Sequence, residues 1–306
     1  IGSGLVGSEM CIRDRDYVFG IVLCALFFAF TLGSHGENGR SFLTDLRQAD
    51  FSSIGSALLG GIIFNASNIL LSAAIAVCGM SVAFPVGVGL ALVLGVIINY
   101  IGEAKGNPIF IFIGVFLITI AIILNGIAYK KASVDNKKVS VKGLTLAISA
   151  GFIMAFFYRF VAASIDLTSF EHPAAGKMTP YTAVFIFSLG ILASNFLFNT
   201  IAMKHPVEGK AIPISGYFKG RAITHLVGLL GGIIWCVGQS FSMIASEKAG
   251  AAISYGLGQG ATLVSALWGI LIWKEFKGAT PICRILNMCM FILFLIGLYC
   301  LIYAGA

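Results

Sequence analysis

The chain has 306 residues, of which 58% are hydrophobic and 11% are charged, against roughly 25% charged residues in an average soluble domain. This composition excludes an ordinary water-soluble fold and fits a protein whose solvent is a lipid bilayer. The formal net charge is +7, but the basic residues lie in short segments between apolar runs and form no single cationic face. A nucleic-acid partner is therefore not expected.

Nine apolar runs of about 20 residues, the length that crosses a hydrocarbon core, predict nine membrane-spanning helices. The runs cover residues 17–33, 54–78, 82–102, 108–128, 143–165, 180–203, 225–246, 250–273 and 281–303. They follow one another so closely that no stretch is left for a separate aqueous domain. The predicted fold class is an all-α integral membrane protein, which crosses the cell membrane (inner or plasma membrane) many times.

Residues 1–15 differ from the rest of the chain, because they are rich in glycine and too polar to span a bilayer. They also lack the basic and apolar regions of a signal peptide. The string IGSGLVGSEMCIRDR resembles a translated sequencing-adapter artefact, and we expect it to be a non-native or disordered leader.

The hexapeptide LLGGII occurs twice, at residues 58–63 and 229–234, which gives an offset of 171 residues. The same offset relates further glycines and several polar or aromatic positions. The related pairs include Gly79 and Gly250, Gly87 and Gly258, Gly89 and Gly260, Phe64 and Trp235, Asn68 and Gln239, and Phe84 and Tyr255. A fixed register over two helices indicates an internal duplication.

The duplication predicts a first repeat over residues 16–128, a cytoplasmic linker over 129–142 and a second repeat over 143–306. The helix at 143–165 then has no partner in the first repeat. We therefore expect a ten-helix architecture of two five-helix repeats, with nine helices present in this chain and the first one missing. Because five is odd, the two repeats have inverted topology, as in many secondary transporters.

The basic residues predict the orientation of the helices, because cytoplasmic loops of membrane proteins are enriched in lysine and arginine. The loops at 129–142, 204–224 and 274–284 hold 12 of these residues, and the loops on the opposite side hold 5. The first set is predicted to face the cytoplasm.

Polar and aromatic side chains recur at helical spacing inside the spans, and such faces must turn away from lipid. The candidate substrate-binding residues are Phe64, Asn65, Asn68, Phe84, Tyr158, Arg159, Asn195, Trp235, Gln239, Tyr255 and Gln259. Their amides and aromatic faces suit a neutral hydroxylated or amide-bearing solute. For each polar residue of these stripes, a hydrogen bond that only ties helices together, worth about 0.6 kcal/mol, is an equal alternative. For Arg159 the equal alternative is a side chain that extends to the outer membrane interface.

Two glycine-rich segments, FPVGVGL and YGLGQGA, occupy related positions in the two repeats. No β-strand precedes them, so they are not dinucleotide-binding motifs. Close helix packing is one interpretation. The other is a loosened helix that exposes backbone groups to substrate, which Pro85 would assist.

Several chemistries lack their motifs in this sequence. The four histidines form no HExxH-like pattern, the cysteines show no metal-type spacing, and no Walker A motif is present. No carboxylate lies in the middle of a span. We therefore expect no metal, no cofactor and no ATP-driven pumping.

The inverted five-plus-five layout, the LLGGII helices and the segment ISYGLGQGATLVSALWGILIWKEFKG at 253–278 together resemble the drug/metabolite transporter superfamily. Within it, the chain is similar to the glucose/ribose porter and ureide permease-like branch. The resemblance implies a ten-helix secondary carrier for sugars or nitrogen-rich heterocycles. This sequence departs from it by lacking the first helix.

The predicted function is a multi-pass permease that moves a small polar solute, sugar or ureide/nucleobase-like, by alternating access. Efflux of amphipathic drugs or metabolites is the alternative within transport. A membrane-embedded enzyme is less favoured, because no cluster of acid, base or metal-binding groups is visible. A coupling ion and a homodimer are partners that the sequence leaves open.

Overall fold

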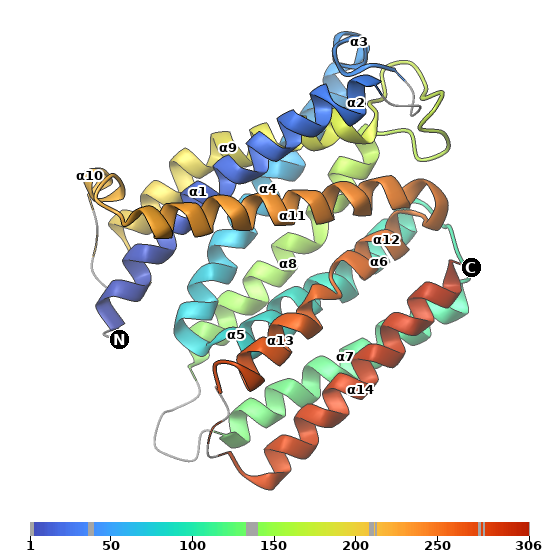
Figure 1. Cartoon of the computed structure of the whole chain (residues 1–306). Helices are drawn as coiled ribbons and strands as arrows, with labels where there is room; N and C mark the ends of the chain where they lie inside the picture. Colours follow the sequence, from blue (N-terminus) through green and yellow to red (C-terminus); the bar gives the residue numbers. More distant parts are fainter. Residues whose placement is uncertain are drawn as a thin grey trace. The chain divides into compact units, whose positions relative to one another are not determined.

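The computed structural model of the chain describes residues 3–35, 40–132, 140–207, 211, 213–274, 277 and 279–305 (Figure 1). Over these ranges the secondary structure is helical, and the only β-type pairing is an isolated bridge between Ile165 and Met178. Within the described residues, eight helical segments are long and apolar enough to cross a membrane. The predicted all-α integral membrane fold is confirmed.

The elements follow the chain in a simple order. They are α1 (Ser3–Phe30), α2 (Leu32–His35), α3 (Phe42–Gln48), α4 (Phe51–Cys78), α5 (Met80–Ala83), the π-helix η1 (Phe84–Val88), α6 (Gly89–Gly102), α7 (Pro108–Ala132), α8 (Val141–Ser164), α9 (Pro180–Lys204), α10 (Ile214–Tyr217), α11 (Ala222–Ala249), α12 (Ala251–Gly258), α13 (Ala261–Leu271) and α14 (Pro281–Ala304).

The chain forms two compact units, and each takes helices from both halves of the sequence. The first unit comprises Ile1–Ile69 and Phe156–Glu247, and the second comprises Leu70–Ala155 and Lys248–Ala306. The division into repeats at 16–128 and 143–306 is a different partition of the chain and stays a prediction. Of the predicted linker, residues 133–139 lie outside the described residues.

Positions 171 residues apart carry the same local structure. Helices α4 and α11 each have 28 residues, and both their first and their last residues differ by that offset. Each is followed by a glycine at positive φ, 83° at Gly79 and 82° at Gly250. Glycine adopts this conformation without the steric cost that other residues meet. The chain therefore turns in the same way at the end of both helices.

The predicted span at 250–273 is not one helix, which corrects the expectation of nine continuous spans. It consists of α12 and α13, with the break at Gln259 and Gly260. There the amide of Gly260 donates to the carbonyl of Leu257, only three residues earlier, at 2.9 Å. Three glycines at alternate positions explain the break, because each costs about 1 kcal/mol relative to alanine in a helix. The related segment of the first half contains the π-helix η1.

Helix α1 starts earlier than the first apolar run. It begins at Ser3, and its membrane-spanning part covers Ile12–Ser34 together with the short α2. Residues 3–15 are part of this helix, and the assignment of residues 1–15 as a non-native or disordered leader stays a prediction.

In the first unit, a buried carboxylate ties the segment before α4 to the segment before α9. Asp45 is fully buried and accepts hydrogen bonds from the backbone amide of Thr179 at 2.8 Å and from its hydroxyl at 3.1 Å. Arg40 pairs with the same carboxylate at 3.0 Å and donates to the carbonyl of Lys177 at 2.7 Å. A buried charge paired in this way holds the polar segment at 40–50 outside the apolar helices.

The second glycine of each LLGGII motif has the same structural role, which is a close contact with the backbone of a neighbouring helix. In the first unit, a Cβ at Gly61 of α4 would overlap the carbonyl oxygen of Phe187 on α9, and a Cβ at Gly232 of α11 would overlap that of Tyr17 on α1. Both contacts are with backbone, which cannot rotate away. Small residues allow this close approach of membrane helices.

In the second unit, helices α7 and α14 lie side by side (Figure 1). The approach is again made by glycines, because a Cβ at Gly114 of α7 would meet the carbonyl of Gly297 on α14. The amide of Asn107 donates to the carbonyl of Ala304 at 2.8 Å, which joins the start of one helix to the end of the other.

Substitution of the contact glycine by alanine is expected to destabilise the first unit. Gly232→Ala inserts a methyl group against the backbone of α1, and such overpacking costs about 1–3 kcal/mol. The matched control is Gly238→Ala on the same helix, where nothing lies within 4 Å of an added Cβ. Thermal unfolding in detergent should show a lowered midpoint for the first variant only. Equal midpoints for both would show that the contact is not as tight as described.

Candidate functional site

Four aromatic rings from four helices of the first unit form a cluster. Phe64 of α4 lies 4.4 Å from Trp235 of α11 between ring centroids, with an interplanar angle of 32°. Phe157 of α8 and Phe187 of α9 lie 5.2 and 5.7 Å from Phe64. The three phenylalanines are buried and Trp235 is half-buried. Aromatic pairs at such separations contribute about 0.5–1.5 kcal/mol beyond their area of burial.

The glycine contacts determine where the two central rings lie. Phe64 follows Gly61 by three residues, and Trp235 follows Gly232 by three, so each ring lies one helical turn beyond the contact. The ring of Phe64 packs on Phe187, and the ring of Trp235 lies 6.2 Å from Tyr17. These are the residues whose carbonyls face the glycines. The pair predicted from the 171-residue register is thus brought into direct contact.

Asn65, Asn195 and Gln239 of the same unit each have a buried amide atom without a hydrogen-bond partner among the described residues. Asn65 donates to the Ser194 hydroxyl at 2.9 Å, but its Oδ1 has no partner. Nδ2 of Asn195 and Nε2 of Gln239 also have none. An unsatisfied buried polar group costs about 1–3 kcal/mol. One acceptor and two donors thus have no partner among the described residues.

The structure places the other three predicted residues of the first unit, Asn68, Tyr158 and Arg159, in different surroundings. Asn68 is half-buried on α4, one turn beyond Phe64 and Asn65. Tyr158 is buried, and its hydroxyl donates to the carbonyl of Ser242 at 3.0 Å, which ties α8 to α11. Arg159 is half-buried and forms no ion pair with any described residue.

The remaining three candidates, Phe84, Tyr255 and Gln259, belong to the second unit. Tyr255 is buried, and its hydroxyl donates to the carbonyl of Ala91 at 3.0 Å while its ring covers Gly95. This arrangement corresponds to the packing alternative. Phe84 begins the π-helix η1, and Gln259 lies at the break between α12 and α13. A substrate site that joins these three to the residues of the first unit stays a prediction.

Sequence reasoning missed two members of the aromatic cluster, Phe157 and Phe187. The chain has 25 phenylalanines, and in apolar helices a ring in a site has the same local pattern as a ring in the core. Helical spacing could have identified Phe187. On α9 the residues Phe187, Ser194 and Asn195 follow i, i+7, i+8 and therefore share one face.

A second polar cluster of the first unit was also missed. Asp16 of α1 is 6% exposed, and its carboxylate lies 2.7 Å from Nδ1 of His225 at the start of α11. The Tyr217 hydroxyl donates to the same carboxylate. These residues are about 200 positions apart in the sequence, so no local motif announces the cluster.

The surroundings of Tyr217 change its acidity. Burial, the hydrogen bond to Asp16 and the negative charge of that carboxylate together raise its pKa from 10.0 to about 12, although the positive charge of Arg15 acts in the opposite direction. No group of three or more metal-binding side chains occurs among the described residues. The cluster is therefore a network of hydrogen bonds that joins α1, α10 and α11.

Comparison with known proteins gives a consistent picture. The family model "Ureide permease" matches residues 15–141 and 137–304. Ureide permease 1 and ureide permease 2 of Arabidopsis thaliana are each 24% identical, over alignments that cover 92% of this chain and 86% of theirs. A Streptococcus agalactiae protein named "Putative sugar uptake protein SAG2157" is 25% identical over 90% of this chain and 84% of its own.

Removal of the Asp16 carboxylate is expected to make Tyr217 more acidic. In Asp16→Asn the negative charge is lost, so the pKa of Tyr217 should fall from about 12 towards 10.0 but stay above it, because the burial persists. Phenolate absorbance during alkaline titration measures this, with Tyr217→Phe in each background as the difference spectrum. An unchanged pKa would show that Asp16 does not act on Tyr217.

Proposed function

Since the chain belongs to the ureide permease family, it is a membrane transporter of small polar solutes and not an enzyme, and we propose that its solute is a ureide or nucleobase-like heterocycle. Nucleobase-like rings are planar, and both classes carry amide or urea groups that donate and accept hydrogen bonds. A sugar is the second candidate, because a relative is named for sugar uptake.

The single observation that carries the proposal is the combination of Trp235 with buried amide atoms that lack partners. A planar heterocycle stacks on the indole face, as π-systems prefer offset-stacked arrangements. Its carbonyl oxygens accept hydrogen bonds from Asn195 and Gln239, and its N–H groups donate to Oδ1 of Asn65. Both kinds of group that a ureide presents thus find a complement.

The lack of charge on the aromatic and amide side chains supports a neutral solute. The aromatic and amide side chains carry no charge, and a charged solute would lose its hydration without gaining a counter-ion. Binding sites made of a few well-placed polar groups among aromatic walls are typical of small-molecule recognition. An amphipathic drug would use the rings but leave the amides unpaired, so efflux of such compounds is not favoured.

We also propose that transport occurs by alternating access. Discontinuous helices at related positions are typical of secondary carriers with repeats. In this chain the break between α12 and α13 and the π-helix η1 supply two such interruptions, both within the second unit. Membership of the wider drug/metabolite transporter superfamily, a coupling ion, a homodimer and location in the plasma membrane belong to the same proposal.

The proposed site predicts that Gln239→Ala and Trp235→Ala weaken substrate affinity. Loss of one hydrogen bond to a desolvated ligand costs about 1–3 kcal/mol, which corresponds to about fivefold to a hundredfold. Counterflow of a labelled ureide in proteoliposomes, with unlabelled sugars and nucleobases as competitors, measures affinity and substrate class together.

Two control variants separate binding from packing. Trp268 of α13 is 52% exposed. Gln48 of α3 donates to the carbonyl of Lys177 at 2.8 Å and accepts from the amide of Gly176 at 2.8 Å, so both ends of its amide have partners. Trp268→Ala should leave affinity unchanged, and Gln48→Ala should lower stability alone. If Gln239→Ala behaved like Gln48→Ala, with lower stability at full affinity, the amide would be a packing group and the site would be rejected.

A further inference from the structure

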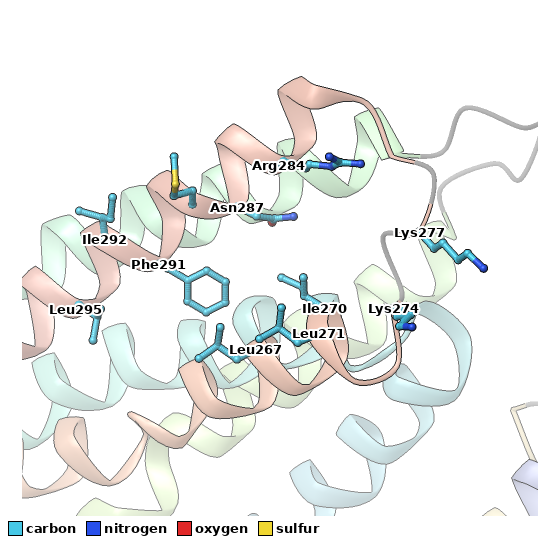
Figure 2. Close-up of a pocket in the computed structure, with 11 residues that line it drawn as sticks. Leu267, Ile270, Leu271, Lys274, Lys277, Arg284, Asn287, Phe291, Ile292 and Leu295 are labelled. Atoms are coloured by element: carbon cyan, nitrogen blue, oxygen red, sulfur yellow. The ribbon is translucent and has the colours of Figure 1, made fainter.

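An apolar groove runs between α13 and α14 of the second unit (Figure 2), with a volume of about 580 Å³. Its walls are formed by aliphatic and aromatic side chains of the two helices. They include Leu267, Ile270 and Leu271 of α13 and Phe291, Ile292 and Leu295 of α14. These six side chains carry no hydrogen-bonding group, and they fit a hydrocarbon chain.

Three cationic side chains gather at one end of the groove, where α13 ends and α14 begins. Lys274, Lys277 and Arg284 all line it, and all three are exposed. None of the three forms an ion pair with a described residue. Glu275 lies outside the described residues, and with it the segment 274–284 carries a formal charge of +2. The end of the groove is therefore suited to an anion.

A buried amide lies between the cations and the apolar walls. Asn287 follows Arg284 by three residues and precedes Phe291 by four, so the three side chains share one face of α14 (Figure 2). It is only 6% exposed, and its Oδ1 has no hydrogen-bond partner among the described residues. A polar atom left unsatisfied at this depth indicates that the groove accepts a ligand with polar groups at that level.

The lining of the groove thus changes from cationic to polar to apolar along its length. An acidic phospholipid has the complementary parts in the same order, which are an anionic phosphate, a polar glycerol ester and an apolar acyl chain. We propose that it binds one such lipid, with the phosphate at Lys274, Lys277 and Arg284, the glycerol and ester region at Asn287, and an acyl chain along the walls. Basic pockets between membrane helices bind anionic headgroups in this way. This inference is independent of the proposed solute.

A second copy of the chain fits the groove less well. A twofold contact through this face would place the same cationic cluster on both sides of the interface, because such contacts are self-complementary. No counter-charge for it lies among the described residues that line the groove. The acidic phospholipid supplies that charge.

Native mass spectrometry of the full chain, delipidated and mixed with equal amounts of phosphatidylglycerol and phosphatidylcholine, tests the proposal. Wild type should retain phosphatidylglycerol over phosphatidylcholine on the order of tenfold, given the attraction of each basic residue for anionic lipid. The triple variant Lys274→Gln/Lys277→Gln/Arg284→Gln should lose this preference. The control Lys204→Gln/Lys219→Gln/Lys248→Gln removes the same charge at exposed residues that do not line the groove, and it should keep the preference.

A groove-filling variant distinguishes a bound lipid from a bound phosphate ion. Ile270→Trp leaves the cations intact but occupies the path of the acyl chain, so it should reduce retained phosphatidylglycerol about as much as the triple variant. In a separate competition experiment with wild type, glycerol phosphate should not displace the bound lipid. If the triple variant fails to fold, Lys277→Gln alone replaces it in the experiment, and this single variant should lose part of the preference for phosphatidylglycerol.

Three results would overturn the proposal. They are no lipid preference in wild type, equal loss in both charge variants, and a dimer that Ile270→Trp abolishes while lipid selectivity is unchanged. The last result would assign the groove to a second copy of the chain.

Discussion

The close approach of helix backbones at the LLGGII glycines is the constraint on which the first unit depends. Lipid tails are as apolar as the side chains, so helices in a bilayer gain little from the hydrophobic effect and associate through packing. At Gly61 and Gly232 that packing reaches the backbone of the neighbouring helix. One turn later each helix carries a ring, and Phe64 and Trp235 meet at 4.4 Å. The aromatic cluster is thus a consequence of the glycine contacts.

Polar groups have two distinct uses in this membrane protein. Several are satisfied within the fold, as Tyr158 on Ser242, Tyr255 on Ala91 and Asp45 on Thr179 show. Other buried amide atoms have no such partner among the described residues. Examples on the helices that carry the aromatic cluster are Oδ1 of Asn65, Nδ2 of Asn195 and Nε2 of Gln239. Leaving such atoms unsatisfied costs free energy, and in the proposed site the bound solute supplies the missing groups. This contrast, and the family of the chain, connect the structure to solute transport.

The sequence predicted the fold class and most spans because apolar length is a direct physical requirement of the bilayer. It also predicted that Phe64 and Trp235 belong together, since the 171-residue register relates them. It failed at 250–273, where glycines break an apolar run that hydropathy alone reads as continuous. It could not separate the packing role of Tyr255 from a binding role, because that depends on where its hydroxyl finds an acceptor. The Asp16–His225 pair and the groove at Arg284 depend on contacts between distant segments, which no local pattern encodes.

The central claim is that the transported solute lies against Trp235. The most direct measurement uses a chain in which Trp235 is the only tryptophan, made with Trp268→Phe and Trp273→Phe, and follows its fluorescence during titration with a ureide. Stacking of the solute on the indole predicts a saturable change whose half-maximum matches the affinity from counterflow and which Gln239→Ala shifts to higher concentration. Full transport by this chain without any fluorescence change would contradict the claim.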